Sequence, residues 1–358
     1  MKITLFIGGL SGGGAERVAC NLVNYLKGNG HEIEIMTMSD DEPSYPLSSG
    51  IKRHILLRGN ERKSFYINSY LRFSRLLYYL RTSTPDVYIV MLPATTILLL
   101  LLRRVTKSKV IASERSLPSV YDKKVQLLLK KMSKKADGWV FQTPGQKEWY
   151  NKYGIQSGVI IPNAINPAFI GSRYTGERRK TIVSVGSLTK PKNHELLITA
   201  FAMIANEFPD YKLVLYGQGN KLDLLQKLVK NLGVDNQVIF SGYSKQIGED
   251  IRDSSLFVLS SDYEGMPNSL MEAMALGLPC VSTDCDGGGA RLLINNEING
   301  LLVPKGNKDT LAQAIRRMLL DKEFAEDCGK EAYKISEQLS PKVVYKKWEE
   351  YIKEIVNA

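Results

Sequence analysis

Apolar residues along this chain fall into short continuous runs that alternate with stretches of helical repeat. Runs of four to six apolar or β-branched residues, the length of a buried strand, occupy residues 3–7, 87–92 and 256–259. Residues 15–27 and 122–136 instead repeat their apolar positions every three or four residues, as amphipathic helices do. Because strands that alternate with helices are typical of α/β proteins with parallel sheets, we expect that fold class.

The same criteria predict the remaining elements and one domain boundary. Residues 162–180 are polar and rich in turn formers, and 358 residues are enough for two hydrophobic cores, so we expect two doubly wound domains. Further strands are predicted at residues 31–38, 51–57, 109–113, 138–143, 158–161, 181–185, 212–216, 237–240 and 279–283, and further helices at 66–81, 267–276 and 341–356.

Two acidic residues lie close to one predicted helix start. Glu264 follows a strand, and Glu272 lies on the next helix. Leu270 and Met274 occupy the opposite side of that helix, so the Glu272 carboxylate should face out of the core. The amides of residues 265–269 open the helix, where an anion such as a diphosphate is favoured. Carboxylates would repel that anion and suit neutral hydroxyls, so the pattern fits a sugar nucleotide; two solvated acids on a surface loop are the alternative.

The segment EGMPNSLMEAMALGLPCVST, residues 264–283, resembles the donor-binding signature of the family 4 retaining glycosyltransferases. The resemblance implies the GT-B fold, an α/β architecture of two doubly wound Rossmann-like domains that face each other across a cleft. It assigns residues 1–165, with a returning helix at 341–358, to an acceptor-binding domain and residues 166–340 to a nucleotide-sugar-binding domain.

In that family the first glutamate of the signature contacts the transferred sugar and the second contacts the ribose, which implies these contacts for Glu264 and Glu272. Residues 186–194, GSLTKPKNH, are similar to the diphosphate loop: Lys192 matches its lysine, Ser187 replaces its arginine, and Lys190 is a candidate to compensate. The resemblance makes Glu264 and Lys192 the catalytic candidates. The donor-binding residues that it implies are Gly13, Gly14, Gly186, Lys190, Lys192, Gly217, Tyr243, Glu264, Gly265, Met266, Pro267, Asn268, Ser269, Leu270 and Glu272.

Two loops of the first domain also match the family. GGGAER, residues 12–17, resembles the loop that lies under the donor phosphates or the acceptor. Its glycines do not give the full G-x-G-x-x-G spacing, which argues against a nicotinamide site with Asp40 or Asp41. SERSLP, residues 113–118, resembles a subset of bacterial surface-polysaccharide enzymes that lack the usual histidine here. Arg115 would then be a substituted contact.

Positive charge is concentrated in the first domain. Residues 1–165 contain 24 Lys and Arg against 12 Asp and Glu, whereas the remainder contains 24 against 25. This distribution favours an anionic partner, either acidic lipid or nucleic acid, although basic residues that only aid solubility are the alternative. We expect no nucleic acid, because aromatic stacking platforms are not interleaved with the lysines.

The predicted helix at 122–136 carries much of this charge. Its core face should comprise Val125, Leu128, Leu129, Met132 and Ala136. Lys123, Lys130 and Lys134 should form one exposed row with Leu127 among them, and Lys124, Lys131 and Lys135 the next row; an ordinary solvated face is the alternative. The acceptor-binding candidates are therefore Arg17, Glu114, Arg115, Lys123, Lys130 and Lys134.

We expect no metal and no other cofactor. Asp284 and Asp286 imitate a metal-binding acid pair, but they run into a glycine loop, residues 287–289, that resembles the family's loop after the strand. The four cysteines lack metal-type spacing and are expected to be reduced thiols in a cytoplasmic protein. The most apolar stretch, residues 88–102, spans 15 residues, which is shorter than the roughly 20 that a transmembrane helix needs.

These patterns lead to one functional hypothesis. We expect a retaining glycosyltransferase that uses a UDP-sugar such as UDP-GalNAc, UDP-GlcNAc, UDP-Gal or UDP-Glc. The expected acceptor is a glycan on a polyprenyl diphosphate carrier in bacterial surface-polysaccharide synthesis, and the expected location is the inner face of the plasma membrane, bound peripherally to its anionic surface. A GT-B sugar-nucleotide epimerase and a basic nucleic-acid-binding protein are the alternatives.

Overall fold

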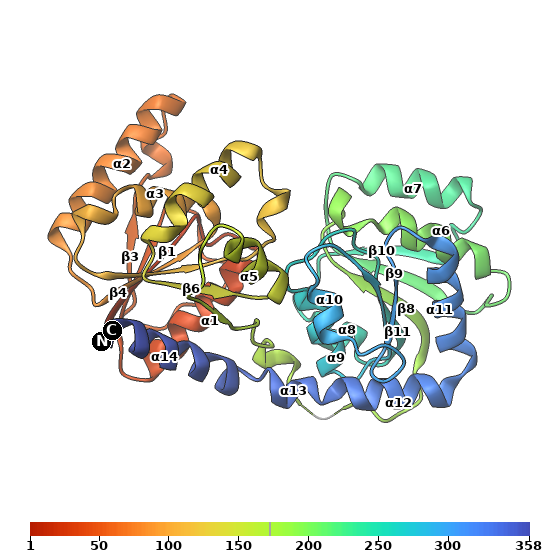
Figure 1. The fold of residues 1–358 in the computed structure, drawn as a ribbon. Coiled ribbons are helices and arrows are strands. Elements are labelled where there is room, and N and C mark those ends of the chain that lie inside the picture. The colour runs from red at the N-terminus through yellow and green to blue at the C-terminus, as the bar shows by residue number, and fades with distance from the viewer. Residues whose placement is uncertain (172) are drawn as a thin grey trace. The chain divides into compact units, whose positions relative to one another are not determined.

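The computed structural model describes residues 1–171 and 173–358. The chain divides into two compact units, which Figure 1 shows as a ribbon. Unit 1 comprises Met1–Ala164 and Val344–Ala358, and unit 2 comprises Ile165–Val343. Each unit is built around one sheet whose strand pairs are parallel, so the predicted α/β fold class is confirmed.

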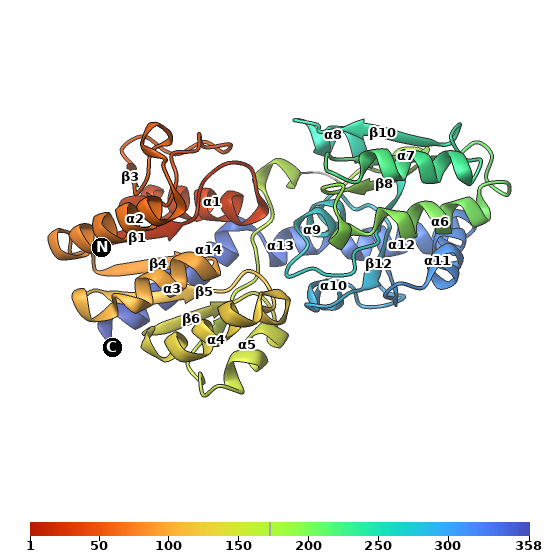
Figure 2. The same ribbon diagram turned by 90° about the horizontal axis from the view of Figure 1, so that it is seen from above.

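The sheet of unit 1 has seven strands in the order β3-β2-β1-β4-β5-β6-β7. These strands are β1 (Lys2–Ile7), β2 (Glu32–Thr37), β3 (Lys52–Ile55), β4 (Val87–Met91), β5 (Lys109–Ser113), β6 (Gly138–Phe141) and β7 (Val159–Ile160). Its helices are α1 (Gly14–Gly28), α2 (Phe65–Thr82), α3 (Pro93–Leu101), α4 (Lys123–Met132), α5 (Pro144–Asn151) and most of α14 (Pro341–Asn357). Helices cover both faces of this sheet, with α2, α3 and α4 on the face opposite α1 and α14 (Figures 1 and 2).

The sheet of unit 2 has six strands in the order β10-β9-β8-β11-β12-β13. These strands are β8 (Arg179–Val185), β9 (Lys212–Tyr216), β10 (Val238–Gly242), β11 (Ser254–Leu259), β12 (Cys280–Asp284) and β13 (Leu301–Pro304). Its helices are α6 (His194–Ile204), α7 (Leu222–Asn231), α8 (Ile247–Ile251), α9 (Asn268–Ala275), α10 (Gly289–Leu293), α11 (Lys308–Leu320), α12 (Lys322–Tyr333) and α13 (Ile335–Gln338).

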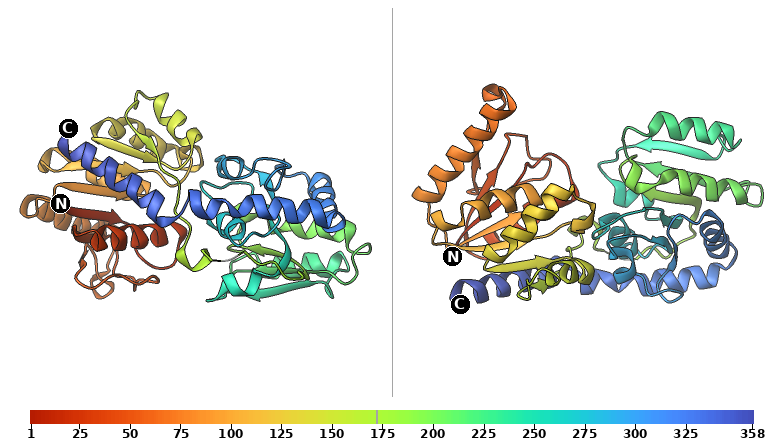
Figure 3. Two further views of the ribbon diagram at one scale, coloured as in Figure 1. Left: turned by 90° about the horizontal axis from the view of Figure 1, so that it is seen from below. Right: turned by 45° about the horizontal axis from the view of Figure 1, so that its top comes forward.

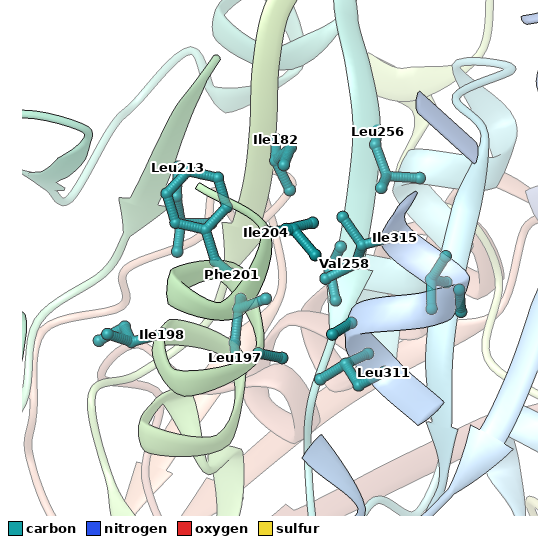
Figure 4. Close-up of a cluster of buried hydrophobic side chains, with 14 of the residues drawn as sticks. Ile182, Leu197, Ile198, Phe201, Ile204, Leu213, Leu256, Val258, Leu311 and Ile315 are labelled. Carbon is teal, nitrogen blue, oxygen red and sulfur yellow. The ribbon is translucent and has the colours of Figure 1, made fainter. Parts of the chain in front are cut away.

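Each face of the unit 2 sheet carries its own apolar core. On one face, α6 and α11 pack against the strands, as Figure 4 shows for Phe201, Leu213, Val258 and Ile315. On the other face, α9 packs against the strands and supplies Leu270, Met271 and Met274 to the buried cluster. Strands covered on both faces read as continuous apolar runs, which is why the sequence pattern located them.

Helix α14 returns the end of the chain to unit 1, where Figure 3 shows it in dark blue along the strands. The predicted stripe of Tyr345, Trp348 and Ile352 is buried, with at most 3% of each residue exposed. The hydroxyl of Tyr351 accepts a hydrogen bond of 3.1 Å from the backbone N–H of Trp139. The last helix is therefore part of the core of unit 1.

The predicted helix at 122–136 is shorter in the structure, and its core face was partly wrong. Helix α4 ends at Met132 and continues as a 3₁₀ turn, Ser133–Lys135. Leu129 is buried, but Leu128 is 39% exposed. Periodicity places both residues on one side of a helix, and it cannot show how far the neighbouring helix covers that side.

Two expectations about the whole chain can be compared with the structure. All four cysteines are free and buried. Across residues 1–171 and 173–358, the helices fall short of the length and apolar composition needed to cross a bilayer.

A buried polar cluster fixes the second half of α2 to the sheet of unit 1. Tyr79 of α2 donates a hydrogen bond to Glu34 of β2, and its hydroxyl lies 3.2 Å from Thr4 Oγ1. Lys2 Nζ and His54 Nε2 lie 3.2 Å and 3.3 Å from the same carboxylate. Burial alone would raise the pKa of Glu34, but the hydrogen bonds from Tyr79 and Lys2 hold this pKa below its ordinary value. The cluster therefore stabilises the ionised carboxylate.

We predict that Tyr79→Phe destabilises unit 1 by about 1–3 kcal/mol at neutral pH, because the buried carboxylate loses a hydrogen bond. Because the pKa of Glu34 is lower in the folded state than in the unfolded state, its ionised carboxylate stabilises unit 1 at pH values above the unfolded pKa. The loss of stability caused by Tyr79→Phe should therefore become smaller as the pH falls through the folded pKa. Urea unfolding monitored by tryptophan fluorescence measures the stability of unit 1, because Trp139, Trp149 and Trp348 all belong to this unit.

The matched control is Tyr78→Phe, which removes a hydroxyl from a tyrosine that is 71% exposed on the same helix. This control should leave the urea midpoint unchanged. Equal midpoints for the Tyr79 and Tyr78 variants would contradict the role assigned to the cluster.

Candidate functional site

The candidate site of unit 2 lies where the strand order of its sheet reverses. β8 pairs with β9 on one side and with β11 on the other, so the loops after β8 and β11 leave the same edge in different directions. Ligands of doubly wound sheets bind beyond the carboxyl ends of the strands at such a point. The two loops carry Lys190 and Lys192 after β8, and Glu264 and Gly265 after β11. The topology thus brings together residues that are far apart in the sequence.

An ion pair joins the two catalytic candidates across these loops. Lys192 Nζ lies 2.5 Å from Glu264 Oε1, and the hydroxyl of Ser261 donates to the same oxygen at 2.8 Å. Both charged side chains are largely shielded from solvent, so their attraction is stronger than that of an exposed pair. The lysine balances the charge of Glu264, and Lys192 and Ser261 together hold the carboxylate in one orientation.

Further hydrogen bonds fix these two loops to each other. The Asp262 N–H donates to the Pro191 carbonyl at 2.9 Å, and Asn193 Nδ2 donates to Asp262 Oδ1 at the same distance. Asn193 also caps α6 through its side-chain oxygen and has a left-handed backbone with φ of 44°. Asparagine tolerates that conformation and suits an N-cap. The sequence analysis missed Asn193, Asp262 and Ser261, although Asn before a helix start is a recognisable signal.

Glycines allow two other loops to approach this site. A Cβ atom on Gly287 would lie 1.9 Å from the carbonyl oxygen of Glu264, and one on Gly289 would lie 1.9 Å from that of Gly265. On the other side, a Cβ on Gly217 would lie 1.9 Å from the carbonyl oxygen of Gly186. These positions admit only glycine without backbone movement. The glycines therefore determine the shape of the loops that carry the candidate residues.

Glu272 of helix α9 is more buried than the sequence pattern predicts. We expected the Glu272 carboxylate to face out of the core, but the residue is only 6% exposed. Every residue from 270 to 275 is buried, because α9 packs against α8, α12 and α13 as well as against the sheet. Periodicity shows a helix's sheet-facing side but not the helices that cover its other sides.

The remaining donor candidates fall into three groups. Lys190 and Tyr243 are exposed, Tyr243 by 70%. The side chains of Met266 and Leu270 belong to the apolar core, so only their backbones are available to a ligand. The backbone of residues 265–269 leads into the N-terminus of α9, with Pro267 as its N-cap, and a helix N-terminus favours an anion.

A buried histidine lies beside the ion pair. His194 is the first residue of α6 and is 3% exposed, and burial lowers its pKa to about 4. The His194 ring is therefore neutral near neutral pH and adds no charge to this loop. Lys192 is the charged residue of the loop that contacts Glu264. The sequence analysis assigned His194 no role.

The acid pair after β12 is engaged by cations. Asp284 pairs with Arg291 at 2.6 Å, and Asp286 pairs with Lys305 at 2.6 Å. Within residues 1–171 and 173–358, no group of three or more His, Cys, Asp or Glu side chains has a metal-binding arrangement.

In unit 1 the strand order reverses between β1 and β4. The glycine loop follows β1, with Gly13 as the N-cap of α1 and Gly14 as its first residue, and Arg17 lies in the first turn. After β4, Leu92 has a strained φ of 77° just before Pro93 opens α3. The first loop thus occupies the position in unit 1 where a doubly wound sheet binds a ligand.

Glu114 and Arg115, two of the acceptor candidates, are buried and bonded to other residues of unit 1. The Glu114 carboxylate accepts hydrogen bonds of 2.6 Å from Tyr121 and 2.7 Å from Tyr150, and the residue is 3% exposed. Burial raises the pKa of this carboxyl, against the opposing effect of the two hydroxyls. Arg115 is 7% exposed, donates to Asn163 Oδ1 at 3.0 Å and lies over the ring of Trp348. Both side chains hold the loop after β5 in place.

Only part of the expected lysine row on α4 is freely exposed. Lys123 and Lys134 are exposed, as is Leu127 at 52%. Lys130 instead lies over the rings of Trp149 and Tyr153, at 5.6 Å and 4.2 Å from their centroids. Cation–π contact with α5 and the turn after it thus removes Lys130 from the freely exposed row.

Comparison with known proteins assigns the fold and the chemistry to a class. Residues 12–169 match the family described as Glycosyltransferase Family 4, and residues 170–335 match the family described as Glycosyl transferases group 1. The chain therefore belongs to the glycosyltransferases that combine these two domains in a GT-B fold.

Three relatives illustrate the similarity. N-acetylgalactosamine-N,N'-diacetylbacillosaminyl-diphospho-undecaprenol 4-alpha-N-acetylgalactosaminyltransferase of Campylobacter jejuni is 29% identical over 89% of this chain and 90% of that protein. GalNAc-alpha-(1->4)-GalNAc-alpha-(1->3)-diNAcBac-PP-undecaprenol alpha-1,4-N-acetyl-D-galactosaminyltransferase of the same organism is 25% identical over 100% of both chains. Exopolysaccharide phosphotransferase SCO2592 of Streptomyces coelicolor is 33% identical over 62% of this chain, but the chain spans only 24% of that protein.

Solved structures share the fold. Alr3699/HepE of Anabaena in complex with UDP superposes with a TM-score of 0.83 over 99% of this chain and 100% of that chain, at 15% identity. At such low identity the likeness shows the fold alone. The relatives named as sugar transferases do not favour the epimerase alternative.

Proposed function

We propose that this glycosyltransferase moves a sugar from a UDP-sugar, with retention of configuration, to a glycan carried on a polyprenyl diphosphate. The observation that carries the proposal is the Lys192–Glu264 pair, which lies at the strand-order reversal of unit 2 close to the N-terminus of α9. A cation, a helix N-terminus and an oriented carboxylate together suit a diphosphate next to a sugar hydroxyl.

The charges of these groups suggest a separate role for each residue. A diphosphate carries more negative charge than Glu264, so the arriving donor would draw Lys192 toward its phosphates. Glu264 would then be free to accept hydrogen bonds from the sugar, while Ser261 keeps its carboxylate oriented. Glu272, which is buried on α9, would bind the ribose hydroxyls. In retaining transfer the leaving phosphate can take the acceptor proton, so the protein mainly needs to position the acceptor and stabilise the diphosphate.

The choice of donor and acceptor draws on relatives. HepE was crystallised with UDP and, in another structure, with UDP-glucose. The names of both Campylobacter relatives describe undecaprenol-linked acceptors. The basic excess of residues 1–165 suits an anionic acceptor and an anionic membrane surface, and we propose peripheral binding at the inner face of the plasma membrane.

We predict that Glu272→Gln and Glu272→Ala weaken binding of UDP, whereas Glu264→Gln mainly lowers kcat. Each lost hydrogen bond to a charged group should cost about 1.5–3 kcal/mol, or roughly 10- to 150-fold. A thermal-shift screen of UDP-sugars identifies the donor, calorimetry with UDP gives Kd, and UDP release gives kcat. Glu249→Gln, at an acid whose side chain is 73% exposed in unit 2, is the control. Wild-type affinity and turnover in all the variants would remove the active-site assignment.

A second prediction concerns metal. Activity should survive EDTA, because Lys192 and the α9 N-terminus supply positive charge and both Asp284 and Asp286 already pair with cations. Initial rates of UDP release before and after chelation test this. Abolition by EDTA with rescue by Mn²⁺ would reject the metal-free mechanism, and loss of that rescue in Asp286→Asn would identify the acid pair as the metal site.

A third prediction concerns the acceptor. Replacing Lys123, Lys131 and Lys134 by Glu should reduce kcat/KM for a lipid-linked acceptor at least tenfold at low salt, because several surface lysines act together near an anionic leaflet. Lys130 is left unchanged, since its packing on Trp149 would confuse the result. UDP binding should be unaffected.

The control for the third prediction replaces three exposed lysines of unit 2, Lys227, Lys230 and Lys308, by Glu. If the α4 variant uses the lipid-linked acceptor as well as this control does, α4 is an ordinary solvated face.

A further inference from the structure

The first half of α2 exposes a group of large apolar side chains. The exposed fractions are 78% for Phe65, 82% for Tyr66, 45% for Ile67, 69% for Tyr70 and 40% for Phe73, and we call these five residues the aromatic tip. Figure 1 and the right panel of Figure 3 show one end of α2 standing clear of the other elements of unit 1. Contiguous exposed apolar surface marks an interaction site in a soluble domain.

The rest of α2 is firmly held, so the tip is presented by a fixed helix. Leu76 and Leu80 are buried in the core of unit 1. Arg75 forms two hydrogen bonds to Glu61, at 2.6 Å and 2.7 Å, and Arg72 donates to the Met38 carbonyl at 3.2 Å. The tip is therefore exposed because the helix extends beyond the sheet that it covers.

Basic residues outnumber acids on the helix that carries the tip. Residues 62–85 contain five Lys and Arg and no Asp or Glu, and the neighbouring acids Asp40, Asp41 and Glu61 are paired with Arg62 and Arg75. Lys63 is exposed next to the tip, and α4, in the same helical layer of unit 1, adds the exposed Lys123 and Lys131. Aromatic rings beside exposed lysines complement an anionic surface that has an apolar interior.

Topology places the tip at a particular edge of the sheet. Helix α2 connects β3 to β4, and all strands of this sheet run parallel, so α2 runs back against them. Its N-terminal half consequently lies at the carboxyl edge. The glycine loop after β1 and the Glu114–Arg115 loop after β5 leave from the same edge.

We propose that the aromatic tip docks unit 1 on an anionic lipid bilayer, with the rings of Phe65, Tyr66 and Tyr70 among the headgroups and the α4 lysines near the lipid phosphates. Tyrosine suits the headgroup region because its ring is apolar and its hydroxyl can hydrogen-bond to water or to a headgroup. A second copy of the chain would bring the same positive charge to the contact, which disfavours it as the occupant. The inference rests on the peripheral membrane binding in the proposed function and identifies the surface that makes the contact; docking itself needs neither donor nor acceptor.

Co-sedimentation with vesicles tests the proposal. The variant carries Phe65→Ser, Tyr66→Ser and Tyr70→Ser, and the control carries Met203→Ser, Leu224→Ser and Leu320→Ser, three exposed apolar residues of unit 2. On phosphatidylcholine vesicles that contain phosphatidylglycerol, the tip variant should partition about tenfold less than wild type and the control should match wild type. On vesicles of phosphatidylcholine alone, wild type should also bind about tenfold less. Unchanged melting temperature and unchanged UDP binding in solution exclude misfolding.

A fluorescent label checks which part of the protein meets the lipid. Because the four native cysteines are buried, Ser69→Cys provides a reactive thiol within the tip, and Asn231→Cys on α7 provides a reference. An environment-sensitive label at position 69, but not at position 231, should shift to the blue on anionic vesicles.

Three results would overturn the proposal: no vesicle binding by wild type, equal binding by the tip variant, or a tip variant that loses self-association in gel filtration while it keeps vesicle binding. A wild type that binds vesicles but not UDP would instead contradict the proposed donor and leave the docking surface standing.

Discussion

The site of unit 2 depends on how closely its backbone loops approach one another. Gly287 and Gly289 bring the loop after β12 against the carbonyl oxygens of Glu264 and Gly265, at a distance that leaves no room for a Cβ atom. Gly217 does the same for Gly186 beside the loop that carries Lys192. Because these contacts involve backbone atoms, few arrangements of the loops are possible. The backbones that carry Lys192 and Glu264 are therefore held at a separation that their side chains span with an ion pair.

Unit 1 achieves rigidity by a different means. Its loop after β5 is organised by the buried Glu114 carboxylate, to which Tyr121 and Tyr150 donate hydrogen bonds, and by Arg115 packed over Trp348. A buried polar network of this kind is stable only while its members are satisfied. The carboxyl edge of this sheet thus contains a fixed polar scaffold, and Lys123 and Lys134 are more exposed than the residues that form it.

The sequence predicted strands β1 to β12 well, because strands covered on both faces read as continuous apolar runs, but among the helices it predicted only α1, α2, α4, α9 and α14. It also indicated the class of site, since Glu264 precedes a helix start and Lys192 follows a strand. It failed where exposure depends on a third element: α9, which carries the buried Glu272, packs against α8, α12 and α13, and Lys130 lies on the aromatic rings of Trp149 and Tyr153. Such coverage comes from tertiary packing, which a local pattern does not contain.

The return of α14 to unit 1 has a consequence for synthesis on the ribosome. Unit 2 is continuous from Ile165 to Val343, so its whole core is synthesised before Val344. Unit 1 needs Val344–Ala358, including Trp348, and these residues are synthesised after all of unit 2. Unit 1 is therefore begun before unit 2 but completed after it, and until then its incomplete core must be kept from aggregating.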